Sequence, residues 1–169
     1  MPQPESLVTD RTQRHVNRIL NLMQQIAGGT ATQAEIDEFL ANRGDGDTDT
    51  WKGAYNYTDL NRVGQWVAYL TERLASAGIH ISTVGKSDWT EADYNNAAAL
   101  DYYLKDISLV RGAIAVMSST PPVPTDLQGL TWWEANDIEK ILIDVDFLIS
   151  QIAKNWFYSG EIYAGECNE

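Results

Sequence analysis

A short polar stretch of the chain reads Gly-Asp-Gly-Asp-Thr-Asp-Thr. Its aspartates, Asp45, Asp47 and Asp49, have the spacing of the first ligands of a calcium loop, where hard oxygen ligands converge on one cation. The later positions do not fit, because Thr50 replaces the turn glycine and Asn56 replaces the bidentate glutamate. We therefore expect a solvated loop here and no metal site.

Several carboxylates follow one another near the C-terminus. General acid–base catalysis of glycoside hydrolysis needs two carboxyl groups about 5–9.5 Å apart across a cleft. Helical spacing puts most of these residues on the face away from the apolar stripe, where water solvates them and they favour solubility. We expect this solvated role for Glu134, Asp137, Glu139, Asp144 and Asp146.

Other catalytic signatures are missing. His15 and His80 are isolated, and Cys167 is the single cysteine, with no neighbouring base in the sequence. No Gly-x-Ser-x-Gly elbow, phosphate loop or dinucleotide fingerprint occurs. The sequence predicts a protein that is not an enzyme and has no cofactor.

The chain is rich in aromatic residues, with six Trp and eight Tyr. Trp51, Trp89, Trp132 and Trp133 stand at the entrances of predicted helices. One interpretation is that they cover the first turns of their helices, as hydrophobic staples do. The other is a binding platform, because Trp and Tyr dominate interaction hot spots and stack on sugars. Both stay open, with Trp132 and Trp133 as candidates for partner binding and Trp51 and Trp89 for sugar stacking.

The C-terminal residues break the helical pattern. Trp156, Phe157 and Tyr158 lead into Tyr-Ser-Gly-Glu and then Tyr163-Ala-Gly-Glu, and glycines at this spacing disfavour a helix. Such a tail either packs on its own bundle or docks on a neighbouring subunit. These four aromatic residues are therefore further candidates for partner binding.

The elements that must position these residues are helices. Capping boxes at Asp10–Gln13, Thr32–Glu35, Thr90–Asp93 and Thr131–Glu134 predict four helix starts, and another helix is expected from Thr58. Pro-rich residues 118–124 predict an extended connection, and residues 79–84 predict a short strand or an extended crossing.

Apolar residues recur at the three–four spacing of helices. In the third helix this stripe is typical of an antiparallel or coiled-coil-like seam. The stripes run through Val16, Ile19, Leu20, Met23 and Ile26; through Leu60, Val63, Val67, Leu70 and Leu74; through Leu100, Tyr103, Leu104, Ile107 and Val110; and through Ala135, Ile138, Leu142, Val145 and Ile149.

The predicted fold is all-α: a helical bundle of three long helices, a short N-terminal two-helix hairpin and an extended C-terminal tail. The hairpin is expected over residues 1–43, the main bundle over 51–157 and the tail over 158–169, as one compact unit.

The charge and the composition argue against several classes of function. The 169 residues carry a net charge of -12, which argues against binding nucleic acid or an anionic membrane surface. No run resembles a signal peptide or a membrane span, so we expect a soluble protein that is made in a cytoplasm.

Four segments together resemble a module of tailed phages and prophages of Gram-positive bacteria, which is described as a tail or minor structural component. They are the run from Lys52 to Val63 (KGAYNYTDLNRV), Lys86–Thr90 (KSDWT), the run from Leu130 to Leu142 (LTWWEANDIEKIL) and Trp156–Glu161 (WFYSGE). The likeness extends from about Val8 to Glu166 and carries no catalytic residues. Tyr94-Asn-Asn-Ala97 stands where the module often has a Pro-Thr pair.

The resemblance implies a virion structural protein of the tail or baseplate, which binds other virion proteins, forms a homo-oligomer in the particle and occupies the host cytoplasm before assembly. Two alternatives stay open: a carbohydrate-binding domain of a phage tail, and an acidic nucleic-acid mimic that inhibits a host enzyme.

Overall fold

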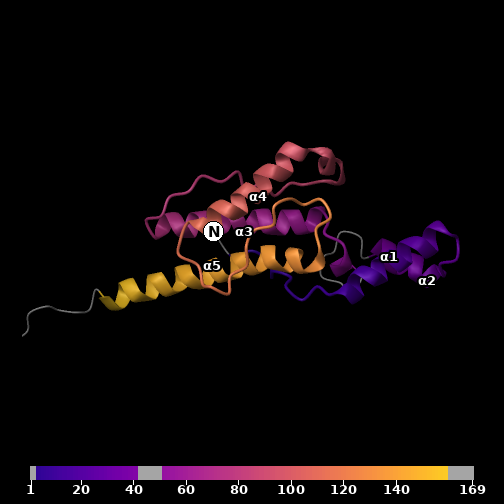
Figure 1. The fold of residues 1–169 in the computed structure, drawn as a ribbon, viewed down its shortest axis with the longest axis horizontal. Helices are drawn as coiled ribbons and strands as arrows, with labels where there is room; N and C mark the ends of the chain where they lie inside the picture. The colour runs from indigo at the N-terminus through magenta and orange to yellow at the C-terminus, as the bar shows by residue number, and fades with distance from the viewer. Residues whose placement is uncertain (1–2, 42–50, 160–169) are drawn as a thin grey trace, which may run out of the picture.

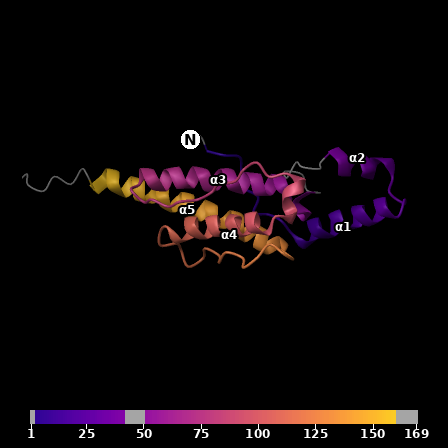
Figure 2. The same ribbon diagram turned by 90° about the horizontal axis from the view of Figure 1, so that it is seen from above.

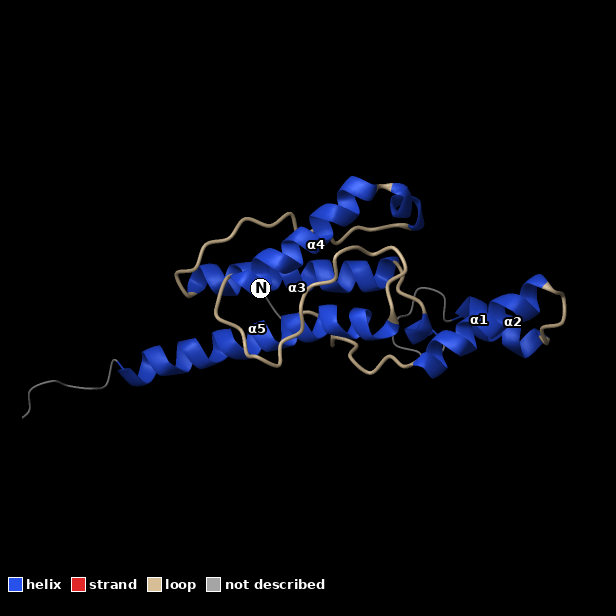
Figure 3. Ribbon diagram, in the orientation of Figure 1, coloured by secondary structure: helices blue, strands red, loops and turns tan. Residues whose placement is uncertain are grey.

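The computed structural model describes residues 3–41 and 51–159, and every regular element within them is helical (Figures 1 and 3). The predicted all-α class is confirmed. Residues 79–84 are extended and form no strand. The α-helices are α1 (Gln13–Ala27), α2 (Gln33–Ala41), α3 (Tyr57–Ser76), α4 (Ala97–Gly112) and α5 (Trp132–Ser159), and the 3-10 helices are η1 (Trp51–Gly53) and η2 (Glu91–Asn95).

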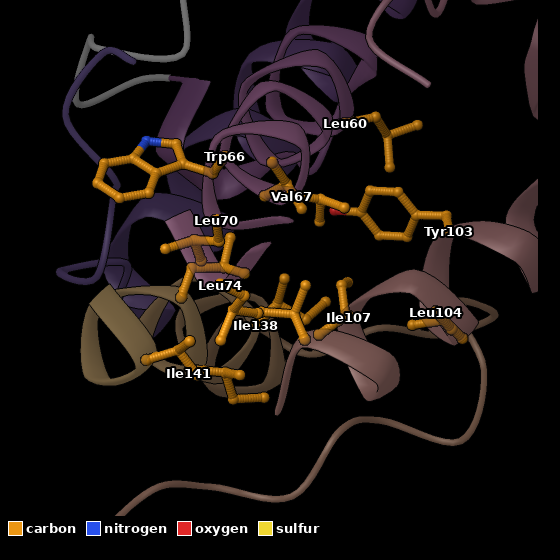
Figure 4. Close-up of a cluster of buried hydrophobic side chains, with 14 of the residues drawn as sticks. Leu60, Trp66, Val67, Leu70, Leu74, Tyr103, Leu104, Ile107, Ile138 and Ile141 are labelled. Carbon is orange, nitrogen blue, oxygen red and sulfur yellow. The ribbon is translucent and has the colours of Figure 1, made fainter. Parts of the chain in front are cut away.

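Helices α3, α4 and α5 pack against one another around a single apolar core. The predicted stripes of these three helices supply it, because residues three and four apart share a helix face. Figure 4 shows side chains from all three helices in this core, among them Leu70 and Leu74 of α3, Ile107 of α4, and Ile138 and Ile141 of α5.

The three long helices run in the same direction (Figure 1). Arg62 of α3 contacts Glu139 near the start of α5, and Arg73 contacts Asp146 further along both helices. An antiparallel seam, one of the two arrangements expected for α3, is therefore wrong. Each parallel pair needs a long return connection, and these are the non-helical segments 79–90 and 113–131.

Side chains of the helices hold the first return connection. The Asp106 carboxylate accepts hydrogen bonds from the Val84 and Gly85 amides at 2.8–3.0 Å. Asn61 and the backbone of Trp89 exchange two hydrogen bonds, of 2.6 and 3.0 Å. The connection passes so close to α3 that a Cβ on Gly64 would lie 1.9 Å from the Lys86 carbonyl oxygen.

The second return connection is held in the same way. Arg111 donates to the carbonyl oxygens of Pro121 at 2.7 Å and Thr120 at 3.2 Å. The buried Thr120 hydroxyl donates to Asp144 of α5 at 2.8 Å. The Pro-rich stretch is non-helical, as predicted.

Two parts of the molecule project beyond the bundle, at opposite ends (Figures 1 and 2). Helices α1 and α2 project at the end where α3 and α5 begin, and Arg18 links them by a 2.8 Å ion pair to Glu38. The last turns of α5 project at the other end. Because α5 includes Ser159, the predicted tail begins at least two residues later than expected, and residues 160–169 lie outside the described part.

The helix starts follow the predictions in part. The boxes of Thr32 with Glu35 and Thr131 with Glu134 are present. The box from Asp10 is wrong: Thr12 caps α1 and pairs with His15, because Asp10 turns to bind Lys52.

The other two starts are displaced. Asn56, two residues before the expected Thr58, caps α3 in a box with Asp59. The box of Thr90 with Asp93 opens η2, whereas α4 begins later, after an Asn96 cap.

Candidate interaction site

Two adjacent tryptophans open α5. The Thr131–Glu134 capping box fixes this first turn, and the two indoles meet edge to face with centroids 5.5 Å apart. Trp132 is half-buried, whereas Trp133 is 50% exposed. An exposed indole keeps a large apolar surface in contact with water, which is typical of residues that bind a partner.

A groove of about 250 Å³ lies beside these tryptophans. It is formed where the start of α5 meets the start of α1 and the residues of η1, so it joins segments that are far apart in the sequence. We call it the Trp132 groove. Its lining includes Gln13, Val16, Lys52, Leu130, Trp132 and Trp133.

Close backbone packing forms one wall of the groove. Gly53 lies against α1 so closely that an added Cβ would come within 2.1 Å of the His15 carbonyl oxygen. The Lys52 ammonium bonds the Asp10 carboxylate at 2.8 Å, and this bond is the main reason that the pKa of Asp10 is lowered. The start of the hairpin therefore packs on η1, through the Gly53 contact with α1 and the Lys52 bond to Asp10.

An apolar stripe continues from the groove along α1. Val16 lines the groove, and Leu20 and Met23 follow at helical spacing, 55% and 52% exposed. The predicted stripe of α1 included Ile19, which is buried as expected, and also Leu20 and Met23, for which burial is wrong; Leu22, outside the predicted stripe, is buried instead. The Trp132 groove and this α1 stripe together form one apolar surface over two elements.

A buried network of four charges lies behind the groove. Arg11 Nη2 donates to Asp59 and Glu139 at 2.7 Å each, and Arg62 donates to the same two carboxylates. Glu139 Oε2 also accepts the Val8 amide at 2.5 Å. With two positive and two negative groups, the network is balanced, as buried charges must be.

This charge network fastens the N-terminal segment to the bundle. Arg11 also donates to the Val8 carbonyl at 2.5 Å, and its backbone exchanges two hydrogen bonds with the side chain of Asn136. Trp66 adds a 2.7 Å hydrogen bond to the Glu5 carbonyl. The start of α1 is thus anchored on α3 and α5, which fixes the position of the groove.

The arginines of the network and two neighbouring tyrosines have raised pKa values. Burial lowers the pKa of Arg11 and Arg62, but the carboxylates of Glu139 and Asp59 outweigh it, so both pKa values are raised. Burial raises the pKa of Tyr55 and Tyr103, whose hydroxyls bond each other at 2.6 Å. These shifts keep the two arginines charged and the two tyrosines protonated near neutral pH.

The predicted solvated role of the α5 carboxylates is wrong for two residues. Glu139 is fully buried, and Asp144 is buried between Thr120 and Lys140. Sequence reasoning did not identify the network of Arg11, Asp59, Arg62 and Glu139. The signal in the sequence was weak: Glu139 stands four residues after Ala135 and three before Leu142, within one edge of the apolar stripe.

Of the other aromatic and calcium-loop candidates, Trp89 has a described side chain, and it does not line the groove. Trp89 is 2% exposed and packs edge to face on Tyr103, so it cannot stack on a sugar in this structure. Trp51 begins η1, and its side chain is outside the described part. Three C-terminal candidates, Trp156, Phe157 and Tyr158, belong to the end of α5, again without described side chains. Tyr163 and the aspartates at 45, 47 and 49 lie outside the described residues.

A second and larger cavity, of about 650 Å³, lies between the start of α4 and residues 126–130. Leucines are the commonest residues in its lining, and the exposed residues Asp101 and Asp126 also border it. Within residues 3–41 and 51–159, no group of three or more His, Cys, Asp or Glu side chains is placed to hold a metal ion. No helix of the described part is long and apolar enough to cross a membrane.

Comparisons of the chain with protein-family models, curated proteins and solved structures give no match.

Proposed function

We propose that this protein is a non-enzymatic structural subunit that acts by assembling with other proteins. Following the sequence resemblance, we assign it to the tail or baseplate of a phage particle. In this proposal the bundle of α3, α4 and α5 is the rigid body, and the N-terminal hairpin and the C-terminal segment beyond Ser159 are its contact arms.

The observation that carries the proposal is the apolar surface of the Trp132 groove and the α1 stripe. Trp133, Leu20 and Met23 are each at least half exposed, and they come from two elements that a buried charge network holds in register. Exposed apolar side chains that are rigidly grouped favour docking, because covering them removes apolar surface from water at little cost in chain entropy.

The buried charges support a structural role over a catalytic one. Their donors and acceptors are mainly directed at one another and at the Val8 backbone, so they hold the N-terminal segment in place. The shifted pKa values of Arg11, Arg62 and the two tyrosines move away from neutrality, whereas catalytic groups are tuned towards it. The virion partners are then recognised by shape and apolar contact.

The two alternatives are less well supported. A carbohydrate platform loses Trp89, which is buried; among the Trp side chains that the structure describes, it keeps the half-exposed Trp133. A nucleic-acid mimic needs carboxylates in rows on the surface, whereas Asp59, Asp106, Glu139 and Asp144 are buried. A glycan array, and a pulldown of DNA-binding enzymes from host lysate, test these alternatives.

The proposal is tested by incorporation into particles. A Trp133→Ser, Leu20→Ser, Met23→Ser variant is expected to fold normally by circular dichroism, because all three side chains are exposed. We expect it to be missing from purified particles that contain the wild-type chain. The matched control is Val84→Ser with Tyr102→Ser, two exposed apolar residues elsewhere on the bundle, which should leave incorporation unchanged. Normal incorporation of the triple variant would refute the proposed surface.

A further inference from the structure

We infer that the C-terminal segment of one copy of this chain, residues 160–169, binds in the Trp132 groove of a second copy, so that subunits join head to tail. This inference rests on the proposed function, because it supplies the self-association contact of the assembly subunit.

A chain cannot place this segment in its own groove. The groove lies at the first turn of α5, and the segment leaves from the last turn, Ser159. The 28 residues of α5 separate these points by about 40 Å, at 1.5 Å per residue. Ten extended residues reach at most about 36 Å, and Tyr163 only about 14 Å. A tyrosine from this segment therefore enters a Trp132 groove only from another molecule.

The segment and the groove are complementary in chemistry. Residues 160–169 contain Ile162, Tyr163 and three glutamates, with no Lys or Arg. In the groove, the two indoles, Val16 and Leu130 can pack against Ile162 and Tyr163 of the segment. A contact between Tyr163 and an indole would add stabilisation beyond the buried area, as aromatic pairs do. The carboxylates would lie close to the Lys52 ammonium at the groove wall.

One ammonium group, that of Lys52, lies at the groove wall. The Lys52 ammonium is already paired with Asp10, but the Asp10 side chain is largely exposed and such pairs contribute little, so an incoming carboxylate can join or replace it. Lys52 therefore gives the groove wall one cationic partner for an acidic segment.

The positions of the two surfaces determine the type of assembly. Figures 1 and 2 show the first turn of α5, which borders the groove, far from its last turn along the long axis. A contact between unlike surfaces is heterologous, and its repetition gives a ring when the rotation closes and a filament when it does not. Each molecule then has one donor end and one acceptor end.

The first experiment titrates the full-length chain with a synthetic peptide of residues 160–169. Indole N–H signals of Trp132 and Trp133 should shift in two-dimensional NMR, whereas those of the buried Trp66 and Trp89 should not. The Trp133→Ser variant should bind the peptide at least about tenfold more weakly, the change expected for a hot-spot side chain. No indole shift up to about 1 mM peptide, a concentration that corresponds to about −4 kcal/mol, would overturn the inference.

The second experiment uses two full-length variants and light scattering coupled to size exclusion. An Ile162→Ser, Tyr163→Ser chain keeps its groove, and a Trp133→Ser chain keeps its segment. Each alone should be monomeric at concentrations where the wild type forms larger species, and an equal mixture should give a dimer that grows no further. Phe147→Ser, an exposed position on α5 that the chain's own segment can approach, is the control and should leave the wild-type species unchanged.

The outcomes separate this inference from the proposed function. A mixture that stays monomeric, or a Phe147→Ser variant that loses the larger species, contradicts head-to-tail binding. If the Ile162→Ser, Tyr163→Ser chain nevertheless enters particles and the groove variant does not, the subunit assembles through its groove with other proteins. The inference then fails while the proposed function stands. If both variants enter particles normally, both fail.

Discussion

Replacing Glu139 by glutamine removes one charge from the buried network at almost constant volume. In the native protein its two oxygens accept hydrogen bonds from Arg11, from two nitrogens of Arg62 and from the Val8 amide, at 2.5–3.2 Å. After the substitution, two guanidinium groups share the single carboxylate of Asp59, and one buried positive charge is uncompensated.

Removing one partner of a buried ion pair costs about 3–5 kcal/mol. No reduction for solvent screening applies, because the Glu139 side chain is fully buried. A chain of this size loses about 2–4 °C in Tm per kcal/mol, so we expect a fall of about 6–20 °C. The Val8 amide should also exchange with solvent faster, since its acceptor is weakened.

Urea unfolding followed by circular dichroism measures the change in free energy. Asp101→Asn, which removes an exposed carboxylate of α4, is the control and should change stability by less than about 0.5 kcal/mol. The double variant Glu139→Met, Arg62→Met restores neutrality and should be more stable than Glu139→Gln. A Glu139→Gln protein within about 1 kcal/mol of wild type would refute the reasoning that this network holds the N-terminal segment.

Three further predictions follow from the packing and from the tyrosine pair. Gly64→Ala should cost about 1–3 kcal/mol in chemical unfolding, because its Cβ would meet a backbone carbonyl at 1.9 Å, whereas Gly112→Ala, with no atom within 4 Å of the new Cβ, should be neutral or stabilising. Equal effects of the two changes would contradict this packing. Trp89→Ala should cost about 3–5 kcal/mol, because the side chain is 2% exposed; a loss below 1 kcal/mol would show that it is not in the core. The pKa values of Tyr55 and Tyr103 are raised by burial, so their contribution to stability is complete below the unfolded pKa of about 10 and is lost as pH rises above it. In an alkaline titration by tyrosinate absorbance, these two should ionise only with unfolding; ionisation in the folded protein would contradict their burial.

The core of the bundle could be predicted because it depends on local periodicity. Residues three and four apart on one helix share a face whatever the rest of the chain does, and the stripes of α3 and α5 are buried as expected. Helix direction could not be predicted in this way. It depends on the path of two long connections, which Asp106, Asn61 and Thr120 fix through hydrogen bonds to distant residues.

The burial of charge could not be predicted for a related reason. Glu139 reads as a surface residue because its partners Arg62 and Arg11 are 77 and 128 residues away in the sequence. Only the tertiary fold brings two positive and two negative groups together, and their mutual attraction then offsets the desolvation cost of burial. A charged residue at the edge of an apolar helical stripe is the sequence signal for this network, and many solvated residues show the same signal.

The sequence indicated which residue types could form the candidate site, but it did not indicate which of these side chains are exposed. Trp89 and Trp133 both stand at a predicted helix entrance, yet one is buried and the other is half exposed. The difference comes from Asn61, which holds the Trp89 backbone against α3, and from Lys86, whose carbonyl oxygen accepts the indole N–H at 3.1 Å. The contacts with Asn61 join residues 28 apart in the sequence, so local sequence does not show them.

Hydroxyl-radical footprinting of the free protein and of purified particles tests the role of the apolar surface most directly, because Trp and Met side chains oxidise readily when exposed. We expect Trp133 and Met23, each about half exposed in the free chain, to be oxidised there and protected in particles. Trp89, which is buried, should be protected in both. Equal oxidation of Trp133 and Met23 in the two samples would contradict the claim that this protein assembles through the Trp132 groove and the α1 stripe.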